Sequence, residues 1–487
     1  MLDRLLKQAQ QLSLTALPLL MPLLVGCSQA GQVVGEADPE LPLPAHFQLH
    51  FNHRDAGRYR QPLNGHWRNG DNLEEYLIQQ INAASDELLL AVQELTLPEI
   101  SQALIRAKKR GVNVQVVLEN NYSKPWSEQH PSDLTPHGRR RLEQLQLLAD
   151  SNRDGRLSAD ERLTGDAVAL LERGGVAKID DTEDGSRGSG LMHHKFVVVD
   201  RALVITGSAN FTSSGIHGDA GASRSRGNVN HLISIESTEL AEVFRNEFQR
   251  MWGDGPGGLH NSRFGRSKDS PGLQTIQVNG VQVDVLFAPH SQRHPGHGLN
   301  VIGQHLAAAQ RSIDLALFVF SAQTVTNVLG EKIKTGISIR LLADPGFASR
   351  SFSEVLDLLG AELPDRFCKI EANNQPLTTP LQTVGTPKLA RGDKLHHKFA
   401  VIDNKTVITG SFNWSPAAAH TNDETLLIIH SPKLAEHFTR EMNRMWRSAE
   451  LGITPQIQRK LDKQRAKCGS GVKRRSANNT SLDNYSG

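Results

Sequence analysis

The segment LMHHKFVVVD (191–200) recurs in the second half of this 487-residue chain as LHHKFAVID (395–403). In each copy, six residues separate the final Asp from a second short motif, GSAN (207–210) or GSFN (410–413). A single His-x-Lys on a strand is usually exposed polar decoration, but two copies with identical offsets are hard to obtain by chance. The sequence therefore predicts an internal duplication of one structural unit.

The residues around each copy follow the same order of short apolar runs and helical periodicity. Apolar runs that alternate with helical segments are typical of βα units whose sheet is covered on both faces. We therefore expect an α/β fold of two similar halves, each a mostly β-sheet core flanked by helices. The halves are expected to pack about a pseudo-two-fold axis with one shared active site. The apolar runs lie at 87–92 and 112–118 in the first half and at 313–319 and 337–342 in the second.

The repeat and the local composition together predict where the two halves, the linker and the C-terminal tail begin and end. The two halves are predicted to span 46–252 and 281–449, and a Gly-, Pro- and Ser-rich stretch predicts a linker at 253–280. Residues 450–487 are polar and basic, which favours a solvated C-terminal tail. The net charge of +2 gives no argument, at the level of the whole chain, for binding to nucleic acid or to membranes.

The first residues have the pattern of a secretory signal. Two basic residues precede a short apolar run at 14–25 that ends in LVGC (24–27). A basic start, a short apolar core and small residues before a cut site predict a signal peptide over 1–26. The last four residues resemble the lipobox of bacterial lipoproteins. This resemblance implies acylation of Cys27, a tether at 28–45 and an extracytoplasmic, membrane-anchored location, with secretion without an anchor as the alternative.

The chain has three cysteines, too few for a small disulfide scaffold. With Cys27 acylated, Cys368 and Cys468 remain. They could pair in an oxidising compartment, although nothing in their spacing requires it.

The repeated motif carries the residues needed for attack on a phosphate. Alternation along a strand puts His193 and Lys195 on one face, because side chains two residues apart point the same way. A fixed ammonium offsets phosphate charge while a neutral imidazole acts as nucleophile. Ser208 and Asn210 add a hydroxyl and an amide as donors for the same phosphate oxygens.

A second histidine completes the chemistry. Phosphodiester cleavage needs a nucleophile on phosphorus and an acid that protonates the departing oxygen. If each half contributes one His to a shared cleft, one forms a phosphohistidine and the other protonates the leaving group, then activates water. This scheme requires no metal. The corresponding residues of the second half are His396, Lys398, Ser411 and Asn413.

The pattern His-x-Lys-(x4)-Asp-(x6)-Gly-Ser-x-Asn, present twice, resembles the signature of the phospholipase D superfamily. Members of that superfamily include phospholipases D, cardiolipin synthases, and endonucleases of the mitochondrial cardiolipin-hydrolase and bacterial types. The resemblance implies a metal-independent, two-step phosphodiesterase with a covalent phosphohistidine, in which His193 is the nucleophile and His396 the general acid and base. It also implies that the lysines and the Ser/Asn pairs bind phosphate and that the aspartates mainly support the site. The catalytic candidates are His193, Lys195, Asp200, His396, Lys398 and Asp403, and the phosphate-binding or supporting candidates include Ser208, Asn210, Ser411 and Asn413.

One position departs from the family's pattern. Members commonly carry an acidic residue shortly past the second motif, where it orients a His of the opposite half. Glu424 stands there in the second half, whereas Asn230 stands there in the first. By this cross-pairing Glu424 serves His193. His396 then faces an amide, which accepts from an imidazole N–H but cannot stabilise an imidazolium charge.

An unrelated signal precedes the first motif. DSNRDGRLSADE (150–161) fits the twelve-residue EF-hand loop at every ligand position, with Gly155 at the sharp turn. We expect a structural Ca²⁺ here that takes no part in catalysis, because the loop lies outside the repeat. The expected ligands are Asp150, Asn152, Asp154, Arg156 through its backbone carbonyl, and Glu161.

The sequence leaves the substrate open. Phospholipid hydrolysis is favoured because the chain is predicted to be anchored at a membrane. An endonuclease is the close alternative, because scattered basic residues could track a nucleic-acid backbone, although the sequence lacks the interleaved aromatic and basic residues that stack bases. Phosphatidyl transfer of the cardiolipin-synthase type and a catalytically silent, anion-binding scaffold are further alternatives. The expected partner is thus a phospholipid membrane or a nucleic acid, and the chain is expected to be a monomer that forms an intramolecular pseudo-dimer.

Overall fold

The computed structural model describes residues 40–63, 65–186 and 190–475. The predicted signal peptide, Cys27 and most of the predicted tether lie outside these residues. Leu43, near the end of the predicted tether, packs against the central hydrophobic core. Within the described ranges, no helix is both long and apolar enough to cross a membrane.

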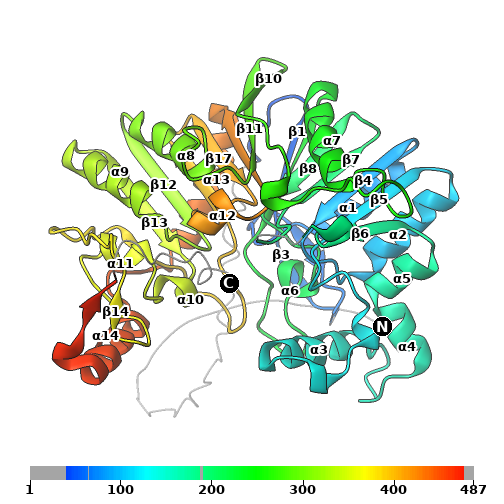
Figure 1. The fold of residues 1–487 in the computed structure, drawn as a ribbon, viewed down its shortest axis with the longest axis horizontal. Helices are drawn as coiled ribbons and strands as arrows, with labels where there is room; N and C mark the ends of the chain where they lie inside the picture. Colours follow the sequence, from blue (N-terminus) through cyan, green and yellow to red (C-terminus); the bar gives the residue numbers. More distant parts are fainter. Residues whose placement is uncertain (1–39, 64, 187–189, 476–487) are drawn as a thin grey trace, which may run out of the picture. The chain divides into compact units, whose positions relative to one another are not determined.

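The first half is built on a seven-stranded mixed sheet (Figure 1). Strands β4, β5 and β6 run parallel to one another, and the other neighbours are antiparallel. From one edge to the other the order is β1 (Phe47–Phe51), β9 (His231–Glu236), β8 (Leu203–Gly207), β7 (Lys195–Val199), β4 (Glu87–Val92), β5 (Asn113–Leu118) and β6 (Ala177–Asp180). A separate ribbon pairs β2 (Arg58–Arg60) with β3 (Trp67–Asn69).

The second half repeats this order in a nine-stranded sheet. The order is β10 (Gln274–Val278), β11 (Val281–Ala288), β18 (Glu424–His430), β17 (Thr406–Gly410), β16 (Lys398–Ile402), β12 (Ser312–Leu317), β13 (Ser338–Ala343), β15 (Val384–Thr386) and β19 (Glu450–Leu451). In the order across the sheet, the strands from β11 to β15 correspond one by one to the strands of the first sheet, from β1 at one edge to β6 at the other. The predicted α/β fold of two similar halves is therefore confirmed. The predicted linker ends earlier than expected, because β10 already forms a hairpin with β11.

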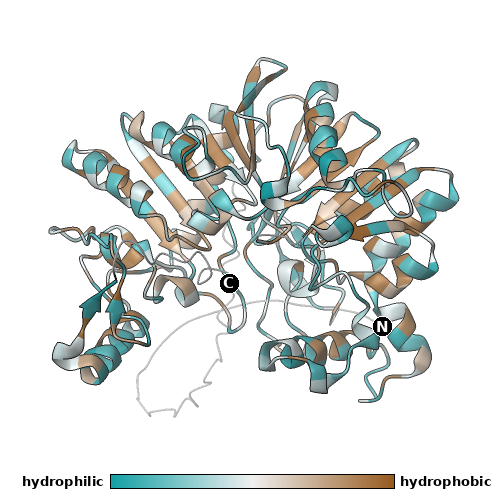
Figure 2. Cartoon of the chain, in the orientation of Figure 1, coloured by the Kyte–Doolittle hydropathy of each residue, from teal (hydrophilic) through white to brown (hydrophobic). Residues whose placement is uncertain are grey.

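Helices cover both faces of each sheet. In β4, Leu88 and Leu90 face the core that contains α1, α2 and α5, while Leu89 and Ala91 face α7 and the opposite core. This alternation is what a strand buried on both faces requires. In Figure 2 the strands are accordingly brown and the outer helical surfaces largely teal. The helices of the first half are α1 (Leu73–Ala83), α2 (Pro98–Lys109), α3 (Pro136–Ala149), α4 (Ala159–Gly165), α5 (Ala167–Arg173), α6 (Ser213–Ile216) and α7 (Thr238–Trp252). Those of the second half are α8 (Gly298–Ala307), α9 (Gln323–Lys334), α10 (Pro345–Ala348), α11 (Glu354–Leu358), α12 (Pro416–His420), α13 (Pro432–Trp446) and α14 (Pro455–Cys468).

One hydrophobic core is shared by both halves. It joins Phe244 of α7 and Phe51 of β1 to Phe438 of α13 and Phe287 of β11. Near the site, the backbone bridges Met192 to Asp423 and, reciprocally, Leu395 to Val229. Such reciprocal pairing of equivalent positions is what a pseudo-two-fold axis produces.

The C-terminal residues differ from the prediction. Residues 455–475 are not a solvated tail, because α14 packs against the second half. Ile457 and Leu461, four residues apart on α14, are buried in the core of that half. A disulfide joins Cys468, the last residue of α14, to Cys368, and the open question of their pairing is thereby answered.

Candidate active site

The two motif histidines meet in one cleft between the halves. His193 and His396 both line this cleft, which encloses about 400 Å³. Each histidine lies two residues before the start of a strand, β7 or β16, and each is held by the opposite half. The His193 N–H donates to the carbonyl of Asp423 (2.9 Å), and the His396 N–H donates to that of Val229 (3.1 Å).

The Nδ1 atoms of the two histidines have different partners. Nδ1 of His193 lies 2.7 Å from Oε2 of Glu424, and Nδ1 of His396 lies 2.9 Å from Oδ1 of Asn230. The predicted cross-pairing is confirmed for both residues. Because Nδ1 is engaged, Nε2 is the nitrogen that remains available to a substrate in each ring.

The two motif serines support these partners. Ser208 Oγ donates to Asn230 Oδ1 and Ser411 Oγ donates to Glu424 Oε2, each at 2.7 Å. Both serines are fully buried. The expectation that these hydroxyls donate to the phosphate is therefore wrong, because they are already committed to the residues that orient the histidines.

Two buried lysines provide the positive charge of the site. Lys195 Nζ donates to the His193 carbonyl (2.8 Å), and Lys398 Nζ donates to the His396 carbonyl (2.6 Å). Burial lowers the pKa of Lys195 to about 7. Burial, followed by the charge of Lys195, holds the pKa of Lys398 well below its usual value. An anion bound beside the two amines would favour their charged forms and raise both pKa values.

The same environment affects the histidines. Burial, and then the two lysines, hold the pKa values of His193 and His396 well below the usual 6.5. Burial also raises the pKa of Glu424 to about 7, against the opposing charge of Lys195. The imidazole of His193 is therefore neutral near pH 7, which is the state that a nucleophile requires.

Asn210 and Asn413 line the cleft at equivalent positions. Asn210 Nδ2 donates to Gln93 Oε1 at 3.1 Å. The Oδ1 atoms of both asparagines are buried without a hydrogen-bond partner among the described residues. Both asparagines are half-buried and line the cleft, whereas Ser208 and Ser411 do not line it, so the amides are the members of the Ser/Asn pairs that face the cleft.

The motif aspartates lie away from the cleft and do not touch the histidines. The Asp200 carboxylate accepts the N–H groups of Ser85, Asp86 and Glu87 at the start of β4. Asp403 accepts those of Gln310, Arg311 and Ser312 at the start of β12. Their inclusion among the catalytic candidates is therefore corrected, and their role is to hold neighbouring strands in place.

The second histidine of each doublet was missed by the sequence reasoning. His194 Nε2 pairs with Glu247 of α7, and His397 Nε2 pairs with Glu441 of α13, each at 3.1 Å. These imidazoles are fully buried behind the cleft. The signal was present, because the doublet His-His occurs in both copies of the motif. A buried Lys268 ammonium forms ion pairs with both Glu247 and Asp423, so the cluster of His194, Glu247 and Asp423 already holds a cation.

The predicted calcium loop lies between α3 and α4, as a helix–loop–helix unit requires. Asp150 and Asp154 accept backbone N–H groups within the loop, and Gly155 has φ +78°. Glu161 instead accepts from Ser151 and Ser158. The backbone course fits the motif. Among the described residues, however, the carboxylates of this loop do not gather into a group whose ligand atoms all lie within 4.8 Å of one another.

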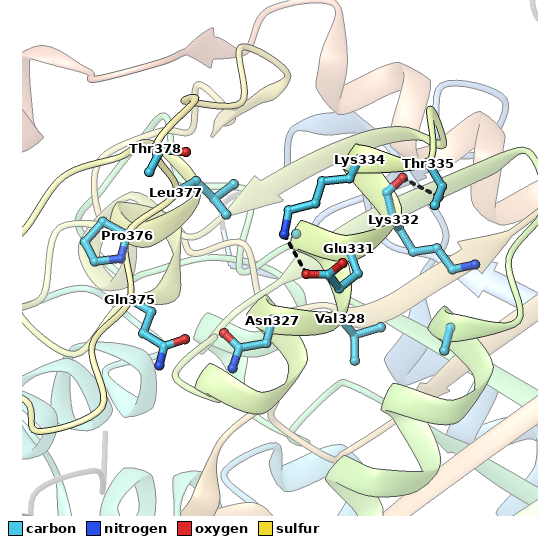
Figure 3. A pocket seen from close by; sticks show the side chains of 12 residues that line it. Asn327, Val328, Glu331, Lys332, Lys334, Thr335, Gln375, Pro376, Leu377 and Thr378 are labelled. Carbon is cyan, nitrogen blue, oxygen red and sulfur yellow. Dashed lines mark hydrogen bonds and ion pairs between the residues drawn. The ribbon is translucent and has the colours of Figure 1, made fainter.

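Most of the residues that line the cleft are polar. The first half contributes Tyr122 and, from α3, His137, Arg140, Arg141 and Gln144; the second half contributes Phe318, Val319 and Lys394. A larger hollow of about 760 Å³ lies elsewhere, between α9 and residues 375–378 (Figure 3). Its charged residues include Lys334 and Glu331, which pair with each other. Because that hollow contains none of the motif residues, the histidine cleft is the candidate active site.

Comparison with known proteins gives a consistent picture. Residues 77–252 and 302–446 match the family model described as cardiolipin synthase, PLD-like domain. A mitochondrial cardiolipin hydrolase of Chlamydomonas reinhardtii is 25% identical over 188 residues, which cover 35% of this chain and 75% of the relative. A phospholipase D of Rickettsia conorii is 27% identical over 162 residues, covering 33% of this chain and 68% of the relative. The solved structure of a phosphatidylserine synthase from Haemophilus influenzae covers 88% of this chain and 94% of its own, with a TM-score of 0.53 at 12% identity, and supports the fold alone.

Proposed function

Because this chain belongs to the phospholipase D superfamily, we propose that it is a phosphodiesterase that works through a phosphohistidine formed on His193. The observation that carries this proposal is the pair of histidines, His193 and His396, that face one cleft from opposite halves. Their Nδ1 atoms are held by Glu424 and Asn230, so both Nε2 atoms are free for chemistry. The cross-half arrangement supplies one nucleophile and one proton donor to a single phosphate.

The reaction proceeds in two displacements. Nε2 of His193 attacks phosphorus and forms a P–N bond, the P–O bond to the leaving group breaks, and His396 protonates the departing oxygen. In the second step His396 takes a proton from water, the oxygen of that water attacks phosphorus, and the P–N bond breaks to free His193. Lys195 and Lys398 offset the charge on the phosphoryl oxygens in both steps, so the scheme needs no metal.

A chromogenic diester separates the two roles. p-Nitrophenolate leaves without protonation, so His396→Ala should release about one p-nitrophenol per active site from bis(p-nitrophenyl) phosphate and then stall. The stalled enzyme should carry a phosphoryl adduct on His193, measurable by intact-mass spectrometry at neutral pH. His193→Ala should give neither burst nor adduct. A burst that persists in His193→Ala would sink the assignment.

Two substrate classes remain candidates, and different observations favour them. Phospholipid hydrolysis is supported by the predicted membrane anchor and by the names of the relatives. Cleavage of a nucleic-acid strand is supported by the cleft itself, whose walls carry amides, arginines and a lysine. Eight large apolar side chains are exposed among the described residues, and none of them lines the cleft. The larger apolar lining residues Leu191, Phe318 and Val319 are outnumbered by polar ones, which supports the nucleic-acid substrate.

Two sequence predictions join this proposal. A structural Ca²⁺ in the loop at 150–161 would brace α3, with oxygen ligands supplied by Asp150, Asn152 and Asp154. The lipid anchor on Cys27 would keep the enzyme outside the cytoplasm. The disulfide between Cys368 and Cys468 supports that location, because disulfides persist in oxidising compartments.

A further inference from the structure

The insertion between β5 and β6 supplies one wall of the cleft. Residues 137, 140, 141 and 144 share one face of α3 and line the cleft. Another face of α3 packs Leu142, Leu145 and Ala149 against Trp126 in a small separate core. In Figure 1, α3 lies apart from α1 and α2, the helices that cover the sheet. Helix α3 and Trp126 are thus a separately packed part of the insertion, and the polar face of α3 is turned to the cleft.

Two arginines on this face have different environments. Nε of Arg141 lies 2.7 Å from Oε1 of Glu94, so its charge is balanced. Arg140, its neighbour, is exposed at the cleft and has no hydrogen bond or ion pair with any described residue. An arginine with free donors at the rim of a phosphate site can bind a further phosphate.

The opposite wall carries a matching cation. Lys394 is exposed, lines the cleft from the second half, and has no side-chain hydrogen bond or ion pair with the described residues. The one acidic lining residue besides Glu94 is Asp219. With Arg140, Arg141 and Lys394 set against Glu94 and Asp219, the lining keeps one net positive charge beyond the buried Lys195 and Lys398.

Each wall also pairs a cation with an aromatic ring. The Arg141 guanidinium lies 4.9 Å from the centroid of Tyr122, and Lys394 Nζ lies 5.5 Å from that of Phe318. Both rings line the cleft. Alternating basic and aromatic side chains are typical of grooves that bind single-stranded nucleic acid. The fold therefore assembles the combination that the linear sequence lacks.

We propose that Arg140 on α3 and Lys394 on the second half bind the phosphates that flank the scissile phosphate of a nucleic-acid strand. This proposal rests on the phosphodiesterase activity proposed above and adds a substrate class to it. A phospholipid with one phosphate would gain nothing from these two cations. A strand with consecutive phosphodiesters would contact both while its central phosphate lies between His193 and His396.

The test compares substrates with and without flanking phosphates. kcat/KM is measured for a single-stranded oligonucleotide and for bis(p-nitrophenyl) phosphate. The proteins compared are the unsubstituted one and the variants Arg140→Gln and Lys394→Gln. Each variant should lower the ratio of oligonucleotide to diester kcat/KM about tenfold, mostly through KM. For the oligonucleotide, the slope of log(kcat/KM) against log salt should become shallower by about 0.7 per removed charge.

Matched controls use exposed cations outside the cleft, Arg162→Gln on α4 and Lys405→Gln after β16, which should leave both substrates unchanged. An unchanged ratio in Arg140→Gln and Lys394→Gln, or an equal loss in the controls, would overturn the subsite. Turnover of phosphatidylglycerol vesicles without cleavage of the oligonucleotide would overturn the substrate class. Failure to hydrolyse the simple diester in a His193-dependent manner would instead refute the proposed function.

Discussion

Nδ1 of His396 lies 2.9 Å from the amide oxygen of Asn230, whereas Nδ1 of His193 lies 2.7 Å from a carboxylate oxygen of Glu424. The two histidines are therefore oriented alike, but one has an ionisable partner and the other a neutral one. A carboxylate stabilises the positive charge that develops on His193 when it bonds to phosphorus. An amide fixes the His396 ring without helping it to hold a proton.

Replacing the amide by a carboxylate should move the alkaline limit of activity. His396 must be protonated to serve as an acid, and burial and then Lys398 hold its pKa low. kcat/KM for a substrate with a poor leaving group should therefore fall as pH rises through that pKa. In Asn230→Asp the new charge raises the pKa, so this alkaline limb should move up by about one pH unit or more. An alkaline limb that does not move in Asn230→Asp would contradict the role of His396 as the acid. The substitution also removes the hydrogen bond from Asn230 Nδ2 to the Gly215 carbonyl, so a thermal melt checks that the variant is folded.

Neutralising Glu424 should remove a titration from the pH profile. Burial raises the pKa of this carboxyl to about 7, so its ionised fraction increases between pH 6 and 8. If the carboxylate supports His193, kcat for bis(p-nitrophenyl) phosphate, whose leaving group needs no proton from His396, should rise with pH across this window. Glu424→Gln should lower kcat about 10²-fold or more and abolish the rise. Ser411→Ala, which removes one donor to the same oxygen, provides a milder variant that should keep the titration.

The motif aspartates should affect stability and leave the chemistry intact. Asp200→Ala removes the acceptor of three backbone N–H groups and should lower the free energy of unfolding by about 1–3 kcal/mol. Those N–H groups hold the pKa of Asp200 below its usual value against the effect of burial. The stabilisation is therefore present at neutral pH and is lost as pH falls through the folded-state pKa. Denaturant melts at pH 7 and pH 3 should show the difference shrinking, with Asp403→Ala behaving alike. A large loss of kcat per folded molecule would restore these residues to the catalytic set.

Calcium should stabilise the insertion without being needed for turnover. Adding Ca²⁺ after EDTA treatment should raise Tm, and Asp150→Ala should cancel the increase, because position one of the loop supplies a ligand. Hydrolysis of bis(p-nitrophenyl) phosphate should be equal with Ca²⁺ and with EDTA. Equal Tm values in both conditions would show that the loop binds no calcium at the concentration used.

The duplicated motif made most of the fold and the centre of the site predictable. Two identical spacings imply two equivalent strand orders, and the family's cross-pairing placed Glu424 opposite His193. The position of Asp200 also follows from the sequence, since five residues of extended chain at about 3.3 Å each put it at the far end of β7 from Lys195.

Other features depend on contacts between distant residues. Helix α14 has few apolar residues, and its packing depends on Ile457, Leu461 and a disulfide to Cys368. The serine hydroxyls could not be assigned, because Ser208 and Ser411 bond to residues on neighbouring strands, across the sheet. Arg140 lines the cleft because the insertion that carries it folds back toward the histidines. No local sequence pattern predicts this placement.

The continuous core between the halves has a consequence for how the enzyme behaves on dilution. When two identical chains build a shared site, the site disappears as the dimer dissociates, and any substitution changes both of its sides at once. Here both halves lie on one chain and share buried phenylalanines. The site should therefore persist at any protein concentration. The surroundings of His396 and His193 are also encoded separately, so natural variation can tune the proton donor while the nucleophile stays as it is.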